Sequence, residues 1–240
     1  MREYVVRLSS LTVKNIKNVK KGTIFMPLAK ERKLKLGGAE ILGIYGQNGS
    51  GKTAIVDTLF FLQRIMIGKE LDQNLIDYID IDSSDAKVNA EFKIFGPNIL
   101  FEVGYYINLI KQNGEVKINR EYLNCAINKD GIRTNKNIFI DYKYNEMECI
   151  FKPQKRLDEV VGKNQETKMD LIVARKIAEK SNCSYIFGES SREILCKEYN
   201  NDFKSYGIVI RELFDFALKD LFVIRNTHSG MITANFLLPM

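Results

Sequence analysis

Apolar and polar residues alternate along much of the chain, and this period of two predicts β-strands whose alternate side chains face a core. The expected strands are residues 5–15, 23–26, 88–94, 101–107, 116–118, 138–140 and 149–151. Gly96-Pro97-Asn98 and Gln112-Asn113-Gly114 are typical of the turns that separate the third, fourth and fifth of these strands. The pattern therefore predicts successive antiparallel strands from residue 86 onward.

A helical period is found in other parts of the chain. Ile55, Leu59 and Leu62 are spaced to lie on one helix face, so residues 53–66 are expected to form a helix that Gly68 ends. The other expected elements are helices at 167–181, 189–197 and 206–219, an acidic helix and loop at 71–85, and a short strand at 221–224.

A short apolar run at residues 40–45 is expected to be a buried strand, and a glycine-rich loop follows it directly. Gly46-Gln47-Asn48-Gly49-Ser50-Gly51-Lys52-Thr53 matches the phosphate-binding pattern G-x-x-x-x-G-K-[ST] without a mismatch. A chance match in an ordinary glycine-rich turn is the alternative. The expected strand, loop and helix follow one another in the order that a P-loop requires, so the sequence predicts a nucleoside triphosphate site for ATP and Mg²⁺.

Each part of this motif has a physical role. The candidate nucleotide-binding residues are Gly46, Asn48, Gly49, Ser50, Gly51, Lys52 and Thr53. The glycines allow a tight turn whose backbone N–H groups face an anion, and the helix N-terminus adds its positive end. Lys52 is expected between the β- and γ-phosphates, and the hydroxyl of Thr53 is the expected metal ligand.

Composition and charge narrow the class of protein. The chain has 240 residues, 45% hydrophobic and 28% charged, which is typical of soluble globular proteins. No apolar run could cross a bilayer and the N-terminus has no signal-peptide core, so we expect a cytoplasmic protein without membrane association. The net charge of +6 and the pI of about 9.0 allow a nucleic-acid partner. The four cysteines form no C-x-x-C pair, which favours reduced thiols over a zinc site.

The P-loop and the opening strand resemble those of the ABC-type ATPase heads of SMC and RecF-like proteins. Within that class, the chain is most similar to bacterial AAA-family ATP-binding proteins of the overcoming-lysogenisation and phage-defence type. The loop fits the G-x-N-G-[SA]-G-K-[ST] form of the class, and Leu-Thr-Val-Lys-Asn-Ile-Lys-Asn at residues 11–18 echoes its opening element. The resemblance implies that Asn15, Lys17 and Asn18 lie near the nucleotide, which makes them further binding candidates.

The resemblance also implies an architecture and an assembly. The implied fold is α/β, with a P-loop NTPase (ABC-ATPase-like) core, an antiparallel β-lobe and a helical segment. The expected division is a core at 1–85, a β-lobe at 86–152, a helical insertion at 153–220 and a return strand of the core at 221–240. ATP-bridged heads imply a homodimer or larger assembly, with nucleic acid or an effector protein as a partner.

Some elements of such a head have no clear counterpart in the chain. We find neither an L-S-G-G-type signature nor a strand that ends in Asp-Glu. Asp141, after residues 137–140, is the nearest candidate for a Mg²⁺ ligand, but a structural residue of a strand is the favoured interpretation. His228 is expected to be a polar loop residue rather than a switch histidine. The chain is therefore expected to be the N-terminal part of a head.

Two functions remain open at this point. The first is an ATPase module whose opening and closing drives a nucleic-acid-directed or toxin-directed effector. The second is a nucleotide-binding sensor or scaffold without turnover, which the missing carboxylate favours. A GTPase is disfavoured because Asn128-Lys129-Asp130 lacks the spacer of N-K-x-D. A small-molecule kinase would need an acceptor pocket and a base that the sequence does not identify.

Overall fold

An antiparallel sheet forms the base of the molecule. The computed structural model describes residues 3–31, 41–71, 73–144, 165–197, 204–226 and 232–234. Seven strands make up the main sheet: β1 (Val5–Ile16), β2 (Val19–Phe25), β3 (Asp85–Gly96), β4 (Ile99–Gln112), β5 (Glu115–Lys129), β6 (Ile132–Arg133) and β7 (Asn137–Lys143). Their order is β2-β1-β3-β4-β5-β6, and β7 also pairs with β5. All of these pairings are antiparallel.

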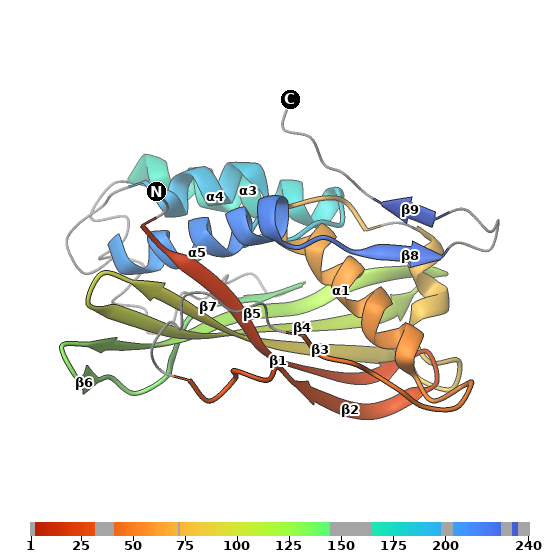
Figure 1. Ribbon diagram of the computed structural model, residues 1–240. Helices are drawn as coiled ribbons and strands as arrows, with labels where there is room; N and C mark the ends of the chain where they lie inside the picture. The colour runs from red at the N-terminus through yellow and green to blue at the C-terminus, as the bar shows by residue number, and fades with distance from the viewer. Residues whose placement is uncertain are drawn as a thin grey trace.

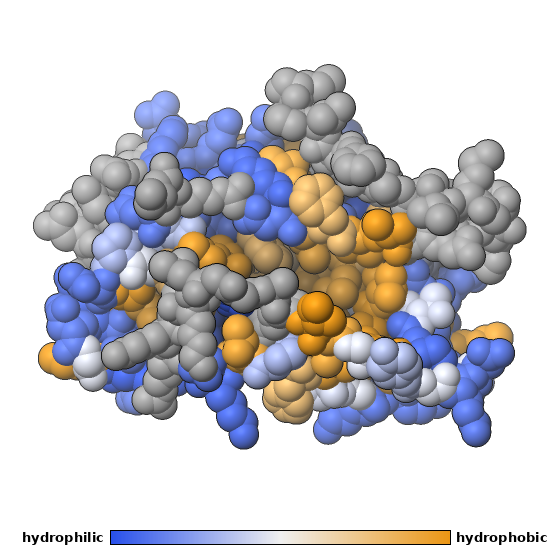
Figure 2. Space-filling model, in the orientation of Figure 1, coloured by the Kyte–Doolittle hydropathy of each residue, from blue (hydrophilic) through white to orange (hydrophobic). Residues whose placement is uncertain are grey.

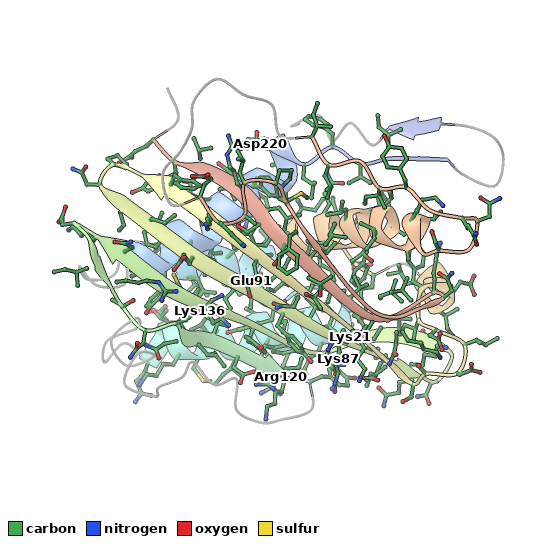
Figure 3. The ribbon with its side chains drawn as sticks, turned by 60° about the horizontal axis from the view of Figure 1, so that its bottom comes forward. Lys21, Lys87, Glu91, Arg120, Lys136 and Asp220 are labelled. Carbon is green, nitrogen blue, oxygen red and sulfur yellow. The ribbon has the colours of Figure 1, made fainter. Side chains whose placement is uncertain are left out.

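The helices lie together on one face of this sheet, and Figure 1 shows the resulting two layers. The helices and remaining short elements are α1 (Lys52–Met66), a 3-10 turn (Gln73–Tyr78), α3 (Gln165–Lys180), α4 (Glu189–Cys196), α5 (Lys204–Asp215), a π-helical turn (Phe216–Asp220), β8 (Ile224–Asn226) and β9 (Ile232–Ala234). Within the described ranges, no helix covers the opposite face of the sheet, which Figure 3 turns forward. None of the described helices is long and apolar enough to cross a membrane.

One continuous apolar core joins the two layers. Alternate residues of the central strands face the helices and are almost fully buried, as the period of two requires. The core side chains of β3 and β4 are Ala86, Val88, Ala90, Phe92, Ile94, Phe101, Val103, Tyr105 and Ile107. Phe61, Leu62 and Ile65 of α1 belong to the same buried cluster, so the helix that follows the P-loop is fixed to the sheet.

A buried carboxylate ties the helical layer to the sheet. Glu121 of β5 is fully buried, and its oxygens accept hydrogen bonds from the Tyr105 hydroxyl at 2.6 Å and the Ser184 hydroxyl at 2.9 Å. The backbone N–H groups of Tyr185 and Ile186 also donate to it, at 2.5 and 3.1 Å. Burial raises the pKa of Glu121, whereas these hydrogen bonds lower it by a smaller amount. The loop before α4 is thus held by a polar contact inside an apolar core.

The pattern of alternation predicted the sheet well. Six of the seven strands expected from alternation are present, and the seventh, at 149–151, lies outside the described residues. The turn between β4 and β5 has Asn113 at φ 52° and Gly114 at φ 80°, as a two-residue hairpin turn requires. The three expected later helices and α1 are also confirmed. β1, in the expected core segment 1–85, pairs with β3, most of which lies in the expected β-lobe 86–152.

Three expectations for shorter elements need correction. The strand expected at 221–224 begins only at Ile224, and the helix expected in 71–85 is the single 3-10 turn. Residues 41–45, expected to belong to a buried strand, lie in no helix or strand and are exposed, with Tyr45 at 94%. A strand is stabilised by hydrogen bonds to a neighbour, and no described strand pairs with this segment. The mixed α/β class is therefore shown, without a parallel strand leading into the loop.

Candidate functional site

Residues 46–53, the predicted P-loop, lie directly before α1 and at its start. The residues of this loop up to Ser50 are exposed, and a turn within it is closed by the N–H of Ser50, which donates to the carbonyl of Gln47 at 3.2 Å. Gly49 and Gly51 have φ values of 84° and 91°, a region in which other residues are strained. A side chain at Gly51 would also place its Cβ 2.5 Å from Val19 of β2. Glycine is therefore required at the point where the loop enters the helix.

Lys52 is folded back over the loop. Its ammonium donates to the carbonyls of Gly46 at 2.6 Å and Gln47 at 2.8 Å, and lies 3.4 Å from the hydroxyl of Ser50. These contacts place a positive charge inside the curve of the loop. An anion entering the loop would meet this charge together with the backbone N–H groups of the helix N-terminus.

The first turn of α1 is suited to bind an anion. It contains no acidic residue, and its N-cap, Gly51, supplies no side chain to occupy the free N–H groups. Thr53 in this turn is exposed, so its hydroxyl is accessible from the loop side of the helix. The residues present therefore fit a phosphate group, and the exposed Thr53 could supply a hydroxyl ligand to a metal ion bound to that phosphate.

The turn between β1 and β2 contacts both the loop and α1. The side-chain amide of Asn18 donates to the carbonyl of Gly49, and the ammonium of Lys17 pairs with Asp57 of α1. The Lys17 ammonium also lies 4.9 Å from the ring centre of Tyr78. Two candidates taken from the resemblance are therefore brought to the P-loop and its helix by the structure.

Asn15, the third candidate, has a different role. Its side-chain amide donates to the backbone carbonyl of Asp85 at 3.1 Å. Its backbone carbonyl accepts from the backbone N–H of Asp80 at 3.0 Å. Asn15 and Lys17 both have positive φ, 55° and 50°, so the chain bends sharply here. Asn15 thus holds the bend in place, while Lys17 and Asn18 extend from it toward the loop.

Asp57 is the site residue that the sequence analysis missed. It is 95% buried on α1, one turn after the P-loop, and its partner Lys17 is distant in sequence. Burial of a carboxylate costs free energy unless the carboxylate has a cationic partner. An aspartate on the core side of the helix expected at 53–66 therefore indicates such a partner, although the sequence does not identify it. The pair fixes the β1–β2 turn against α1.

The structure offers no preformed metal centre within the residues that it describes. No group of three or more His, Cys, Asp or Glu side chains is arranged there to hold an ion. Asp141 lies in β7, 98% buried, and both of its oxygens accept from Arg120 at 2.7 Å. These hydrogen bonds raise the pKa of Arg120. Asp141 therefore has a structural partner within the sheet, whereas His228 lies outside the described residues.

The cysteines are not arranged as ligands. Cys125, Cys183 and Cys196 are free thiols, and Cys149 lies outside the described residues. Burial, with smaller contributions from Glu121 and Glu70, raises the pKa of Cys183 to about 11, and burial also raises that of Cys196. These two thiols are therefore protonated at neutral pH and are poor nucleophiles.

Comparison with known proteins leaves the chain without an assigned family. No protein-family model matches the sequence, and no curated protein is significantly similar to it.

Proposed function

We propose that the chain binds Mg²⁺-ATP through residues 46–53. The observation that supports this most directly is the position of Lys52, whose ammonium lies over the loop carbonyls at the N-terminus of α1. Phosphate oxygens are stronger acceptors for an ammonium than neutral carbonyls are. A triphosphate would therefore draw Lys52 away from Gly46 and Gln47 and expose the loop N–H groups to its own oxygens.

Each neighbouring residue has a part in this proposal. Thr53 would complete the coordination of Mg²⁺ already held by the phosphates, which explains why no separate cluster of acids is needed. Asn18 holds the carbonyl of Gly49, and Lys17 holds Asp57, so the loop is supported on its β2 side before nucleotide arrives. Support of this kind lowers the ordering cost of binding.

We propose that the module belongs to an SMC/RecF-like ABC-type ATPase, in which ATP joins two heads. Opening and closing of such a dimer would act on nucleic acid or on an effector protein. The alternative function is a nucleotide-dependent sensor or scaffold without turnover. One observation favours that alternative for this chain alone. The two carboxylates that we consider as a catalytic base are both ion-paired, Asp57 with Lys17 and Asp141 with Arg120.

Calorimetric titration with Mg²⁺-ATP, Mg²⁺-GTP and Mg²⁺-ADP tests the proposal. We expect saturable ATP binding that Lys52→Ala weakens at least about 100-fold, because the loss of a charge paired with phosphate costs several kcal/mol. Lys129→Ala, at the exposed end of β5, is the matched control and is expected to bind like the unaltered protein. Equal binding by the Lys52 and Lys129 variants, or none by the unaltered protein, would refute the proposed site.

Phosphate release measured on the same samples separates the two functions. Turnover would support the ATPase module and identify a base within this chain. Saturable binding without turnover would support the sensor, or a site that a second polypeptide completes.

Asn18 and Asn15 should respond differently to truncation. Asn18→Ala is expected to weaken ATP binding about three- to tenfold with little change in melting temperature, because it removes a support of the P-loop. Asn15→Ala is expected to lower the melting temperature and leave the affinity of the folded protein unchanged, because Asn15 contacts Asp85 instead. Thermal unfolding and calorimetry on both variants check this contrast, and an Asn15 effect on affinity equal to that of Asn18 would contradict it.

A further inference from the structure

The face of the sheet opposite the helices, which we call the open face, carries a line of five basic residues and one asparagine that crosses five strand pairings. Strand register places the following residues directly beside one another: Lys21 of β2, Lys14 of β1, Lys87 of β3, Asn108 of β4, Arg120 of β5 and Lys143 of β7. We call this line the basic row. Lys14 and Lys21 are exposed, and Figure 3 shows Lys21, Lys87 and Arg120 close together along the sheet.

A second line runs beside the basic row on the same face. Two residues further along each central strand, the register aligns Thr23, Thr12, Asn89, Tyr106, Tyr122 and Asp141, which we call the stacking row. The rings of Tyr106 and Tyr122 are stacked, 4.7 Å between centroids and 16° from parallel. The guanidinium of Arg120 lies 5.0 Å from the ring centre of Tyr122, so that the two rows meet at this residue.

The Tyr106 side of this stack faces small side chains. The neighbour of Tyr106 on β3 is Asn89, and the next residue in the row is Thr12 on β1. Both side chains are far shorter than a tyrosine. A flat group placed above Asn89 would continue the stack on the outer face of Tyr106. The side-chain amide of Asn89 donates a hydrogen bond to Glu91 at 3.4 Å and lies beneath that position. It could also form a hydrogen bond with the polar edge of the ring.

The charges on this face are unequally distributed. Two cations of the basic row are paired within this face, Arg120 with Asp141 and Lys87 with Asp85 at 3.5 Å, while Glu91 is paired with Lys136 outside the row. Lys14 and Lys21 face one another across β1 and β2, and like charges opposite one another cost free energy that an anion would relieve. The excess positive charge of the basic row is therefore concentrated at Lys14 and Lys21, and this end of the row is complementary to negative charges.

We propose that this face binds a single-stranded nucleic acid, with phosphates along the basic row and bases along the stacking row. A membrane surface could use the basic row but offers no flat rings for the stacking row, and an acidic peptide does not carry a flat ring on every charged unit as a nucleic acid does. Duplex DNA keeps its bases within the helix, so it could reach only the basic row. With strands about 4.8 Å apart, the rows extend for about 24 Å, which suits a short single-stranded segment of about four nucleotides.

Fluorescence anisotropy with a labelled oligothymidine of about 12 nucleotides tests this proposal. We expect Tyr106→Ala to weaken binding about tenfold and Tyr106→Phe to preserve it, because both aromatic residues stack. Lys14→Ala/Lys21→Ala is expected to weaken binding about three- to tenfold and to lower the slope of log Kd against log salt by about 1.4. Lys129→Ala/Lys176→Ala, which alters exposed lysines outside the rows, is the matched control.

Three results would overturn the proposal: tighter binding of a duplex or of heparin than of the oligothymidine, no effect of Tyr106→Ala, or an equal effect of the control lysine pair. The test is independent of the nucleotide site, because Lys52→Ala leaves the open face unchanged and is expected to bind the oligothymidine normally. Melting temperatures of all variants ensure that folded proteins are compared.

Discussion

Glu121→Ala is expected to lower the free energy of unfolding by about 3–5 kcal/mol. The substitution leaves the hydroxyls of Tyr105 and Ser184 and the N–H groups of Tyr185 and Ile186 without their acceptor inside the core. Each buried donor that loses its partner costs about 1–3 kcal/mol, although these costs do not simply add. Urea unfolding followed by circular dichroism measures the change.

Glu121→Gln separates the shape of this side chain from its charge. The amide keeps one acceptor oxygen, but its NH₂ group faces donors that need an acceptor. We therefore expect the free energy of unfolding to fall by about 1–3 kcal/mol. The pKa of Glu121 is raised by burial, so above the ordinary carboxyl value of 4.5 the folded protein retains a proton that the unfolded chain releases. Stability from this group therefore falls as the pH rises through the raised pKa.

The pH dependence gives a second measurement on the same pair of proteins. The unaltered protein is expected to exceed Glu121→Gln in stability by more at about pH 5 than at about pH 8. The reason is that the carboxyl group of Glu121 titrates, whereas the amide of the variant does not. A difference that grows with pH would show that the hydrogen bonds outweigh burial and that the folded carboxyl has a lowered pKa. Glu121→Ala more stable than Glu121→Gln at both pH values would contradict the proposed role of the acceptor.

Leu62→Ala is expected to destabilise the protein by about 2–5 kcal/mol, which would make it the second-largest effect. Leu62 is fully buried where α1 packs on the sheet, and truncation leaves a cavity in addition to the lost apolar contact. Leu59→Ala is the matched control on the same helix, because Leu59 is only partly buried. We expect it to cost about half as much or less.

Thermal unfolding of the two leucine variants checks the packing of α1. A loss of 1 kcal/mol lowers the melting temperature of a protein of this size by about 2–4 °C, so the variants should be well resolved. Where both variants are folded, they are expected to bind ATP alike, because neither side chain belongs to the loop. Equal destabilisation by both would show that the face of α1 toward the sheet is not the one described.

The sheet could be predicted from the sequence because alternation is a local property. β3, β4 and β5 have long runs of period two, and the Asn113-Gly114 turn sets the register of β4 against β5 as far as the bulge at Asn108 and Leu109. The prediction of a P-loop depends on a similarly local property, since eight consecutive residues carry the whole motif. Helix α1 needed only the spacing of its apolar residues.

The remainder depended on contacts between distant residues. Residues 41–45 have the composition of a buried strand, yet composition does not supply a neighbouring strand, and the segment stays exposed. Figure 2 shows apolar side chains gathered on the surface on the side where α1 and β8 lie. The Lys17–Asp57 pair joins residues that no local pattern relates, and the two rows of the open face became visible only once the register was known.

The pairing of β1 with β3 has a consequence for how the protein folds. β3, β4 and β5 follow one another through short turns, so their pairing closes only small loops and has a low entropic cost. The β1–β3 pairing instead closes a loop that contains the P-loop, all of α1 and the 3-10 turn. The proposed nucleotide site thus belongs to the long-range part of the topology, and we expect its assembly to follow formation of the β3–β5 sheet.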